Sequence, residues 1–186
     1  MFNEKYIKSE ISSITKEESI IKYSKNIENQ EKLRKCSVLI LPMENFRKQA
    51  PLSFNEGFRN LFFYLQEKLG KEQIDLCIDK ENIKELALHS DEFRLGIFLL
   101  EYIIAPTFVG LLIDYLKTKL FAKKEDTVSV DLILSNEEEP QSKNIKISYK
   151  GSPDEMENKI LNEIYSYDKK GVIKKQSEQH KIDVLS

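Results

Sequence analysis

Residues 93–120 read FRLGIFLLEYIIAPTFVGLLIDYLKTKL, and this apolar stretch decides the fold. Between residues 95 and 116 it is interrupted only by Glu101, Pro106 and Asp114. Proline lacks a backbone donor and clashes with the preceding helical turn, although it suits the first turn of a helix. We therefore expect one helix that ends near residue 105 and a second that begins at Pro106, together forming a central, proline-broken apolar helix.

Two interpretations of residues 95–116 are open. About 20 apolar residues can cross a bilayer, and Lys117, Lys119, Lys123 and Lys124 follow the stretch at the place where an interface would lie. An acidic residue inside the bilayer costs roughly 2.5–3.5 kcal/mol on insertion scales, however, and this stretch contains two. We expect the segment to be the interior of the protein, and a membrane-associating segment is the alternative.

Strands are predicted on both sides of this segment. Residues 36–41 form a short apolar run that ends at Pro42, which is typical of a strand buried on both faces. Residues 74–78 read as a second such strand. Residues 127–134 and 145–149 alternate between apolar and polar side chains, which predicts a hairpin with a long acidic loop.

Helices are predicted around the strands. Ser53 and Glu56 have the spacing of a capping box that opens a helix over residues 53–69. Residues 82–88 could form one or two helical turns. Ser152 followed by Pro153 predicts the start of a C-terminal helix, and residues 16–34 predict a weak amphipathic one.

These elements predict an α/β (α+β) fold, in which a small mixed sheet of about four strands is covered by helices. The length of 186 residues suits one domain. We expect a polar N-terminal helical extension over residues 1–35, a single α/β domain over 36–167, and a polar C-terminal tail over 168–186.

Composition narrows the class of protein. The net charge of -2 argues against nucleic acid as a partner. Cys36 and Cys77 lie in or near apolar runs, which indicates buried free thiols, a reducing compartment and a cytoplasmic location. The N-terminus lacks the apolar region of a signal peptide. His89 and His180 show no metal-ligand spacing, so we predict neither a metal nor a cofactor site.

No catalytic motif is apparent. The chain has no nucleophile elbow, phosphate-binding loop, dinucleotide fingerprint or zinc-protease motif. Pro153-Asp154 with Glu157-Asn158-Lys159 superficially matches the PD…ExK pattern of metal-dependent nucleases, whose acids come from neighbouring strands. Here all of them fall on one predicted helix, where acids in the first turn are favoured by the helix dipole. We predict no catalytic residues.

Three parts occur in a particular order. They are VLILP at 38–42 with SFNEG at 53–57, then IIAPTFVGLL at 103–112, then VSVDL at 128–132 with IKISYKGS at 145–152. Over residues 36–165 this order resembles small uncharacterised bacterial proteins that accompany anti-phage defence loci. The resemblance implies an accessory role and no catalytic residues.

Three functions are therefore considered. The first is a non-enzymatic interaction subunit of a larger bacterial assembly, whose N-terminal helix binds a protein partner through Ile20, Ile21 and Ile27. The second is a membrane-associating effector that uses residues 95–116. The third is an enzyme or nucleic-acid binder with scattered site residues, for which a deep polar pocket with converging acids or a basic groove would be the sign. The sequence indicates no particular small molecule.

Overall fold

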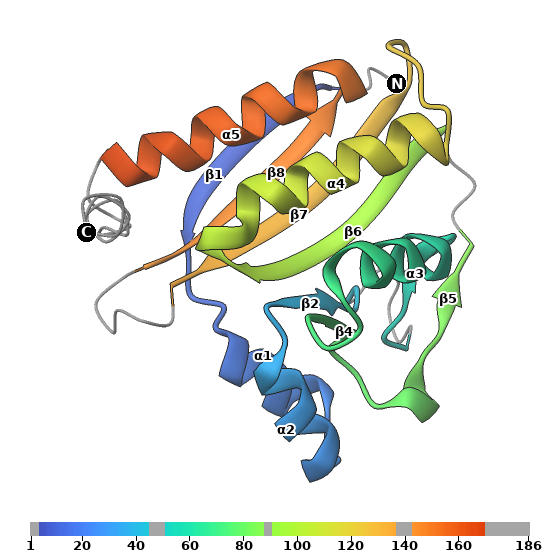
Figure 1. The fold of residues 1–186 in the computed structure, drawn as a ribbon, viewed down its shortest axis with the longest axis vertical. Coiled ribbons are helices and arrows are strands. Elements are labelled where there is room, and N and C mark those ends of the chain that lie inside the picture. The colour runs from blue at the N-terminus through green and yellow to red at the C-terminus, as the bar shows by residue number, and fades with distance from the viewer. Residues whose placement is uncertain (1–3, 45–50, 88–90, 137–142, 170–186) are drawn as a thin grey trace, which may run out of the picture.

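The computed structural model describes residues 4–44, 51–87, 91–136 and 143–169 (Figure 1). The helices are α1 (Lys16–Tyr23), α2 (Ile27–Lys35), α3 (Phe58–Leu69), α4 (Ala105–Thr118) and α5 (Pro153–Lys169). The strands are β1 (Tyr6–Ser12), β2 (Val38–Leu41), β3 (Phe54–Asn55), β4 (Ile74–Leu76), β5 (Glu85–Leu86), β6 (Glu92–Glu101), β7 (Thr127–Ser135) and β8 (Asn144–Gly151).

One mixed sheet organises the molecule, with the strand order β1-β8-β7-β6-β2-β4. The pairs β6–β7 and β2–β4 are parallel, and the pairs β1–β8, β8–β7 and β6–β2 are antiparallel. β3 and β5 form a separate parallel pair. The predicted α/β class is confirmed, with a sheet of six strands in place of about four.

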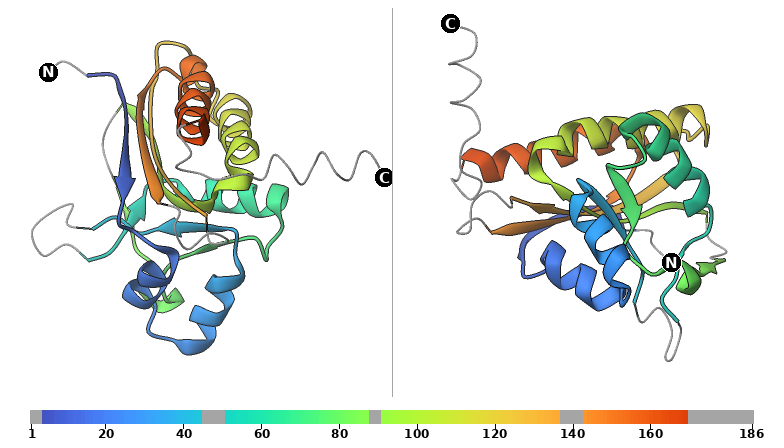
Figure 2. Two further views of the ribbon diagram at one scale, coloured as in Figure 1. Left: turned by 90° about the vertical axis from the view of Figure 1, so that its left-hand side faces the viewer. Right: turned by 60° about the horizontal axis from the view of Figure 1, so that its bottom comes forward.

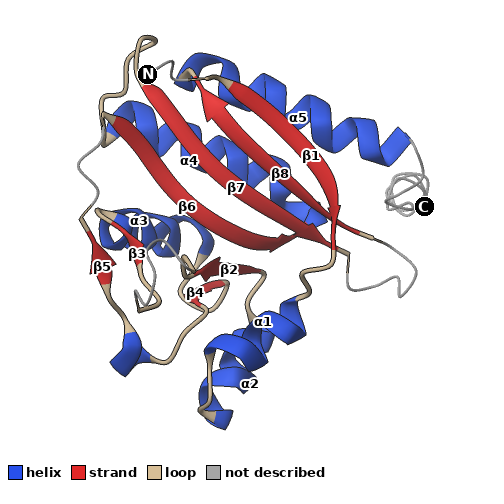
Figure 3. Ribbon diagram, turned by 180° about the vertical axis from the view of Figure 1, so that it is seen from behind, coloured by secondary structure: helices blue, strands red, loops and turns tan. Residues whose placement is uncertain are grey.

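The two faces of the sheet are covered unequally. α3, α4 and α5 lie on one face, and α1 with α2 lies beyond the β2–β4 end on the other side (Figures 1 and 2). The larger core lies under α3–α5, whereas Ile20 and Leu33 of α1 and α2 pack with Leu39 and Leu99 of the sheet. The face of β1, β8 and β7 opposite α5 is left open (Figure 3).

The expected helix before Ala105 is wrong, because residues 92–101 form β6, followed by a 3₁₀ turn over Tyr102–Ile104. β6 is covered on both faces, since Phe98 and Leu100 lie in the core under α3–α5 and Leu99 packs with α1 and α2, so this run shows no alternation. A buried strand and a buried helix look alike in such a run. The second expectation is confirmed: Pro106 lies in the first turn of α4, whose Phe108, Leu112 and Leu116 are fully buried. Residues 95–116 therefore supply the protein's own core.

The N-terminal residues contain more structure than was predicted. The expected helix over 16–34 is two helices, divided at residues 24–26 where Asn26 caps α2. Residues 6–12 form β1, a strand that was not predicted and that pairs along the whole of β8. Only two of its seven residues are strongly apolar, so the sequence of this segment lacks the apolar pattern that predicts a buried strand.

Two local expectations around α3 are also wrong. Ser53 caps no helix: it forms a β-bridge with Met43, and the next two residues are β3. The helix begins at Phe58 after Gly57, whose φ of 80° is a left-handed conformation that glycine adopts readily. Residues 82–87 contain the end of a 3₁₀ turn and strand β5, and residue 88 lies outside the described residues. The β3–β5 pairing, which local propensity does not reveal, explains both errors.

Other expectations are confirmed. The hairpin of β7 and β8, the strand at 74–76 and the start of α5 at Pro153 all occur. Ser152 Oγ accepts a hydrogen bond from the backbone N–H of Asp154 at 3.3 Å. His89, the loop 137–142 and residues 170–186, which include His180 and most of the predicted tail, lie outside the described residues.

Candidate functional site

A depression of ≈ 310 Å³ lies on the open face of the sheet. It is bordered by residues from five strands, β1, β3, β6, β7 and β8. Its polar residues are Tyr6, Asn55, Glu92, Arg94, Ser129, Asp131 and Lys150. We treat Asn55, Glu92, Arg94 and Lys150 as the polar cluster of the open face, because a hydrogen bond and ion pairs join them.

The strands position the cluster through their registers. Arg94 pairs with Ser129 of β7, which in turn pairs with Lys150 of β8. A β-bulge follows Arg94, and Gly96 there has a φ of 122°, which a residue with a Cβ adopts only with strain. Asn55 Nδ2 donates to the carbonyl oxygen of Arg94 at 3.1 Å and so ties β3 to the bulge.

Glu92 is the electrostatic centre of the cluster. Lys150 Nζ lies 2.9 Å from Glu92 Oε2, and Arg94 Nε lies 3.8 Å from Glu92 Oε1. Burial alone would raise the pKa of Glu92, but hydrogen bonds with Ser129 and Lys150 and the two cations outweigh it and lower the pKa below its ordinary value of 4.5. A carboxylate held ionised in this way is a weak general base near neutral pH.

Two polar atoms of the cluster have no hydrogen-bond partner among the described residues, Asn55 Oδ1 and Arg94 Nε. Both are buried in the wall between the depression and a second one of ≈ 320 Å³ beside the start of α3. Such atoms normally find a partner. Both atoms are enclosed by the protein, and the charged groups of the cluster are paired with one another.

The cluster does not show the signs set out for a catalytic or nucleic-acid site. Its carboxylate is paired with Lys150, and Asp131 of the same face lies 3.8 Å from Lys146 Nζ. Acidic and basic side chains alternate across the described strands, so they make neither a set of converging acids nor a basic groove. The arrangement is a mixed-charge surface whose acidic and basic side chains are paired.

The two thiols are buried, as predicted, between the sheet and the α1–α2 pair. Burial, followed by the charge of Asp75, raises the pKa of Cys77 to about 12 and also raises that of Cys36. Because the thiolate is the reactive form, both side chains are poor nucleophiles and poor metal ligands in the folded protein.

The acids of the PD…ExK-like pattern lie on one helix, as expected. Asp154, Glu157 and Lys159 all belong to α5, and Lys159 Nζ pairs with Glu155 Oε2 at 2.7 Å. Within residues 4–44, 51–87, 91–136 and 143–169 there is no group of three or more His, Cys, Asp or Glu side chains that could hold a metal ion.

The three predicted partner-binding residues divide into two kinds. Ile20 is fully buried and packs in the core between α1, α2 and the sheet, so it is not available to a partner. Ile21 is 50% exposed and Ile27 is 71% exposed. The last two flank the turn between α1 and α2.

Sequence reasoning missed the polar cluster, because its members come from β3, β6 and β8. One signal was present: Lys146, Ser148 and Lys150 alternate with apolar residues in β8, which marks a polar face. The sequence does not show that β8 lies in the same sheet as β6, because the residues of β6 are expected to form a helix.

None of the helices in the described part of the chain has both the length and the apolar character needed to cross a membrane. No protein-family model matches the sequence, and neither a curated protein nor a solved structure matches it.

Proposed function

We propose that this protein is a non-enzymatic interaction subunit of a larger bacterial assembly and binds a protein partner through the α1–α2 pair. The observation that carries the proposal is the exposure of Ile21 and Ile27 on helices that are otherwise fixed to the sheet. The proposal also includes a role in an anti-phage defence locus, which rests on the sequence resemblance alone. It includes a cytoplasmic location, which rests on the reduced thiols alone.

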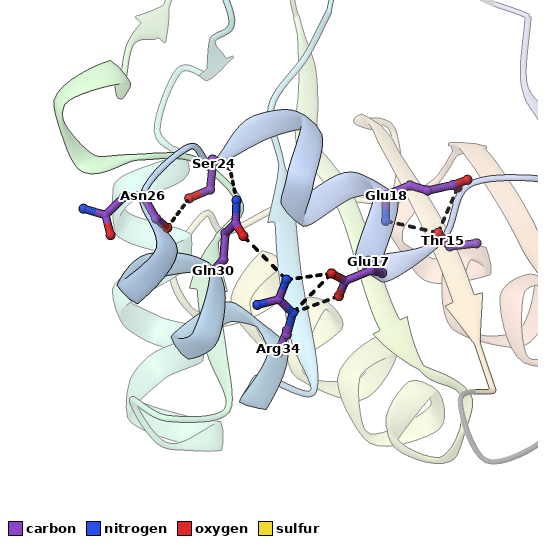
Figure 4. Close-up of polar contacts among 7 residues, drawn as sticks. All are labelled: Thr15, Glu17, Glu18, Ser24, Asn26, Gln30 and Arg34. Carbon is purple, nitrogen blue, oxygen red and sulfur yellow. Dashed lines mark hydrogen bonds and ion pairs between the residues drawn. The ribbon is translucent and has the colours of Figure 1, made fainter.

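Several contacts hold α1 against α2. Arg34 of α2 donates to Glu17 of α1 from both Nε and Nη2, at 2.9 Å and 2.6 Å (Figure 4). Lys16 Nζ donates to the carbonyl oxygen of Arg34 at 2.9 Å. Gln30 Nε2 donates to the carbonyl oxygen of Ser24 at 2.8 Å, across the turn between the helices (Figure 4).

The pair is also anchored to the rest of the protein. Asp79, which follows β4, accepts hydrogen bonds from Ser24 Oγ, from the backbone N–H of Lys25 and from Asn29 Nδ2. A surface fixed in this way loses little conformational entropy when a partner binds, so its exposed apolar side chains can contribute most of their burial energy.

The test compares four forms of the full chain, each tagged and purified from native cells: wild type, Ile21→Gln, Ile27→Gln and Ile103→Gln. Ile103 is the matched control because it is 58% exposed and lies far along the chain, before α4. We expect one protein to co-purify with wild type and with I103Q. Its yield should fall at least about fivefold with I21Q and I27Q, as for a residue at the centre of an interface.

The four forms should have equal thermal unfolding temperatures, which would show that the substitutions at exposed positions leave the fold intact. Recovery of only this chain from wild-type cells would count against the proposal. Equal recovery of the same partner with I21Q and I27Q would show that any interaction uses another surface.

The membrane-associating alternative needs residues 95–116 to leave the core. Seven residues of α4 are buried, and β6 pairs with β2 and β7 on either side. Flotation with anionic liposomes separates the two functions, since protein that stays at the bottom of the gradient under native conditions removes this alternative.

A further inference from the structure

β1 ends the six-stranded sheet, and no described strand pairs with its outer edge. Figure 3 shows it at the border of the sheet, with β8 on its inner side. An edge strand presents a row of backbone N–H and C=O groups that can pair with another strand. The outer edge of the seven residues Tyr6–Ser12 can therefore pair with another strand.

The side chains of β1 are arranged symmetrically about its middle residue, Ser9. Lys8 and Glu10 flank it on the open face of the sheet, because they pair with Ser148 and Lys146 of β8. Ile7 and Ile11 lie one position further out, on the face that carries α5. Ile11 is 55% exposed.

We infer that β1 pairs in antiparallel fashion with β1 of a second copy of this chain, with the two-fold axis beside Ser9. In this register Lys8 lies opposite Glu10 of the other copy, and Glu10 lies opposite its Lys8. Ile7 lies opposite Ile11 of the other copy and covers it. Opposite charges and apolar side chains directly across a strand pair are both stabilising.

The neighbouring registers are disfavoured. A two-fold axis perpendicular to the sheet places each side chain of the second copy on the same face as in the first copy. The registers that meet this condition differ by moving the axis along β1 by one residue at a time. Centring it on residue 8 places Lys8 opposite Lys8, and centring it on residue 10 places Glu10 opposite Glu10. Of these three axes, only the one at Ser9 avoids like charges, and it also pairs all seven residues of β1.

α5 contacts β1 through polar side chains. Glu163 accepts a hydrogen bond from Ser9 Oγ at 2.6 Å, and Tyr167 Oη lies 3.2 Å from Ser9 Oγ, so the flank of α5 above β1 is polar. The paired strands alone bury less surface than the roughly 800 Å² per partner of a standard interface, so we expect a weak dimer.

Charge reversal tests the register. The mass of the full chain is measured by sedimentation from about 1 to 200 µM, a range suited to small interfaces. Wild type should approach twice 21.8 kDa at the upper end. Lys8→Glu and Glu10→Lys should each raise the dissociation constant at least about tenfold, because the two-fold symmetry places each substitution at two contacts of the dimer. The double variant K8E/E10K should return the dissociation constant to the wild-type value.

A cross-link tests the axis. Directly opposite residues of antiparallel strands have Cα atoms about 4.5–5.5 Å apart, which is within the range of a disulfide. Ser9→Cys should therefore give an oxidised covalent dimer on a non-reducing gel. Ser12→Cys, three residues from the axis in the same strand, is the matched control and should stay monomeric.

A wild-type mass of 21.8 kDa at every concentration would overturn the inference. So would a dimer that K8E and E10K leave unchanged, or one that the double variant fails to restore. Equal circular dichroism of all variants ensures that a lost dimer reflects a lost contact and not a lost fold. The outcome is independent of the proposed α1–α2 interaction.

Discussion

Gly151 shows how one residue can restrict the packing of the sheet. A Cβ at this position would lie 2.6 Å from Tyr149 Oη and 3.0 Å from its Cζ. Tyr149 is 1% exposed and donates from Oη to the carbonyl oxygen of Ser152 at 2.7 Å. The ring cannot move aside without losing this hydrogen bond and its place in the core.

We predict that Gly151→Ala lowers the free energy of unfolding by about 1–3 kcal/mol, as overpacking of a core does. Gly110→Ala is the matched control, because nothing lies within 4 Å of its Cβ and the residue is inside α4. That variant should gain up to about 1 kcal/mol from helix propensity. Urea unfolding curves compare the two, and equal midpoints would contradict this account of Gly151.

At the scale of elements, Asp79 is the anchor of α1 and α2. It is 4% exposed and accepts hydrogen bonds from the turn between the helices. Burial alone would raise the pKa of Asp79, but hydrogen bonds from Ser24, Lys25 and Asn29 outweigh it and lower the pKa below its ordinary value of 3.8.

We predict that Asp79→Ala destabilises the protein by about 1–3 kcal/mol at pH 7, because it leaves buried donors without an acceptor. The folded-state pKa is depressed, so the contribution is complete above the ordinary pKa of 3.8 and is lost as the pH falls through the lower folded value. Wild type and D79A should therefore converge in urea stability toward pH 3. A constant difference from pH 7 to pH 3 would refute the role of the ionised carboxylate.

The elements that the sequence predicted are those with a local signature. Pro106 locates the start of α4, and the alternation in β7 and β8 identifies a hairpin. β6 was missed because Leu95–Leu100 is apolar on both faces, and β1 was missed because its partner lies at the other end of the chain. The polar cluster was not predicted for the same reason, since Glu92 and Lys150 meet only through the sheet.

At the scale of the whole molecule, the layer between the sheet and α3–α5 carries most of the core. Phe108 of α4 is fully buried against Phe98 of β6, with ring centroids 5.0 Å apart. This contact joins the two halves of the apolar stretch, which the sequence suggested would be two helices.

We predict that Phe108→Ala lowers the free energy of unfolding by about 3–5 kcal/mol, the usual cost of removing a buried aromatic ring. Phe63→Ala is the control, because Phe63 is 61% exposed on α3 and should change stability by no more than about 0.5 kcal/mol. Thermal unfolding of both variants measures the difference, and a small effect at Phe108 would mean that the core lies elsewhere.

The pairing of β1 with β8 also constrains how the chain is made. Ser9 and its partner Glu163 are 154 positions apart, so β1 takes its place in the sheet only after β8 and α5 have been synthesised. Until then the backbone of β1 is hydrogen-bonded to water, and contacts at such long separation form slowly. We therefore expect β1 to pair late in folding, and the unpaired segment is a place where incomplete chains can associate.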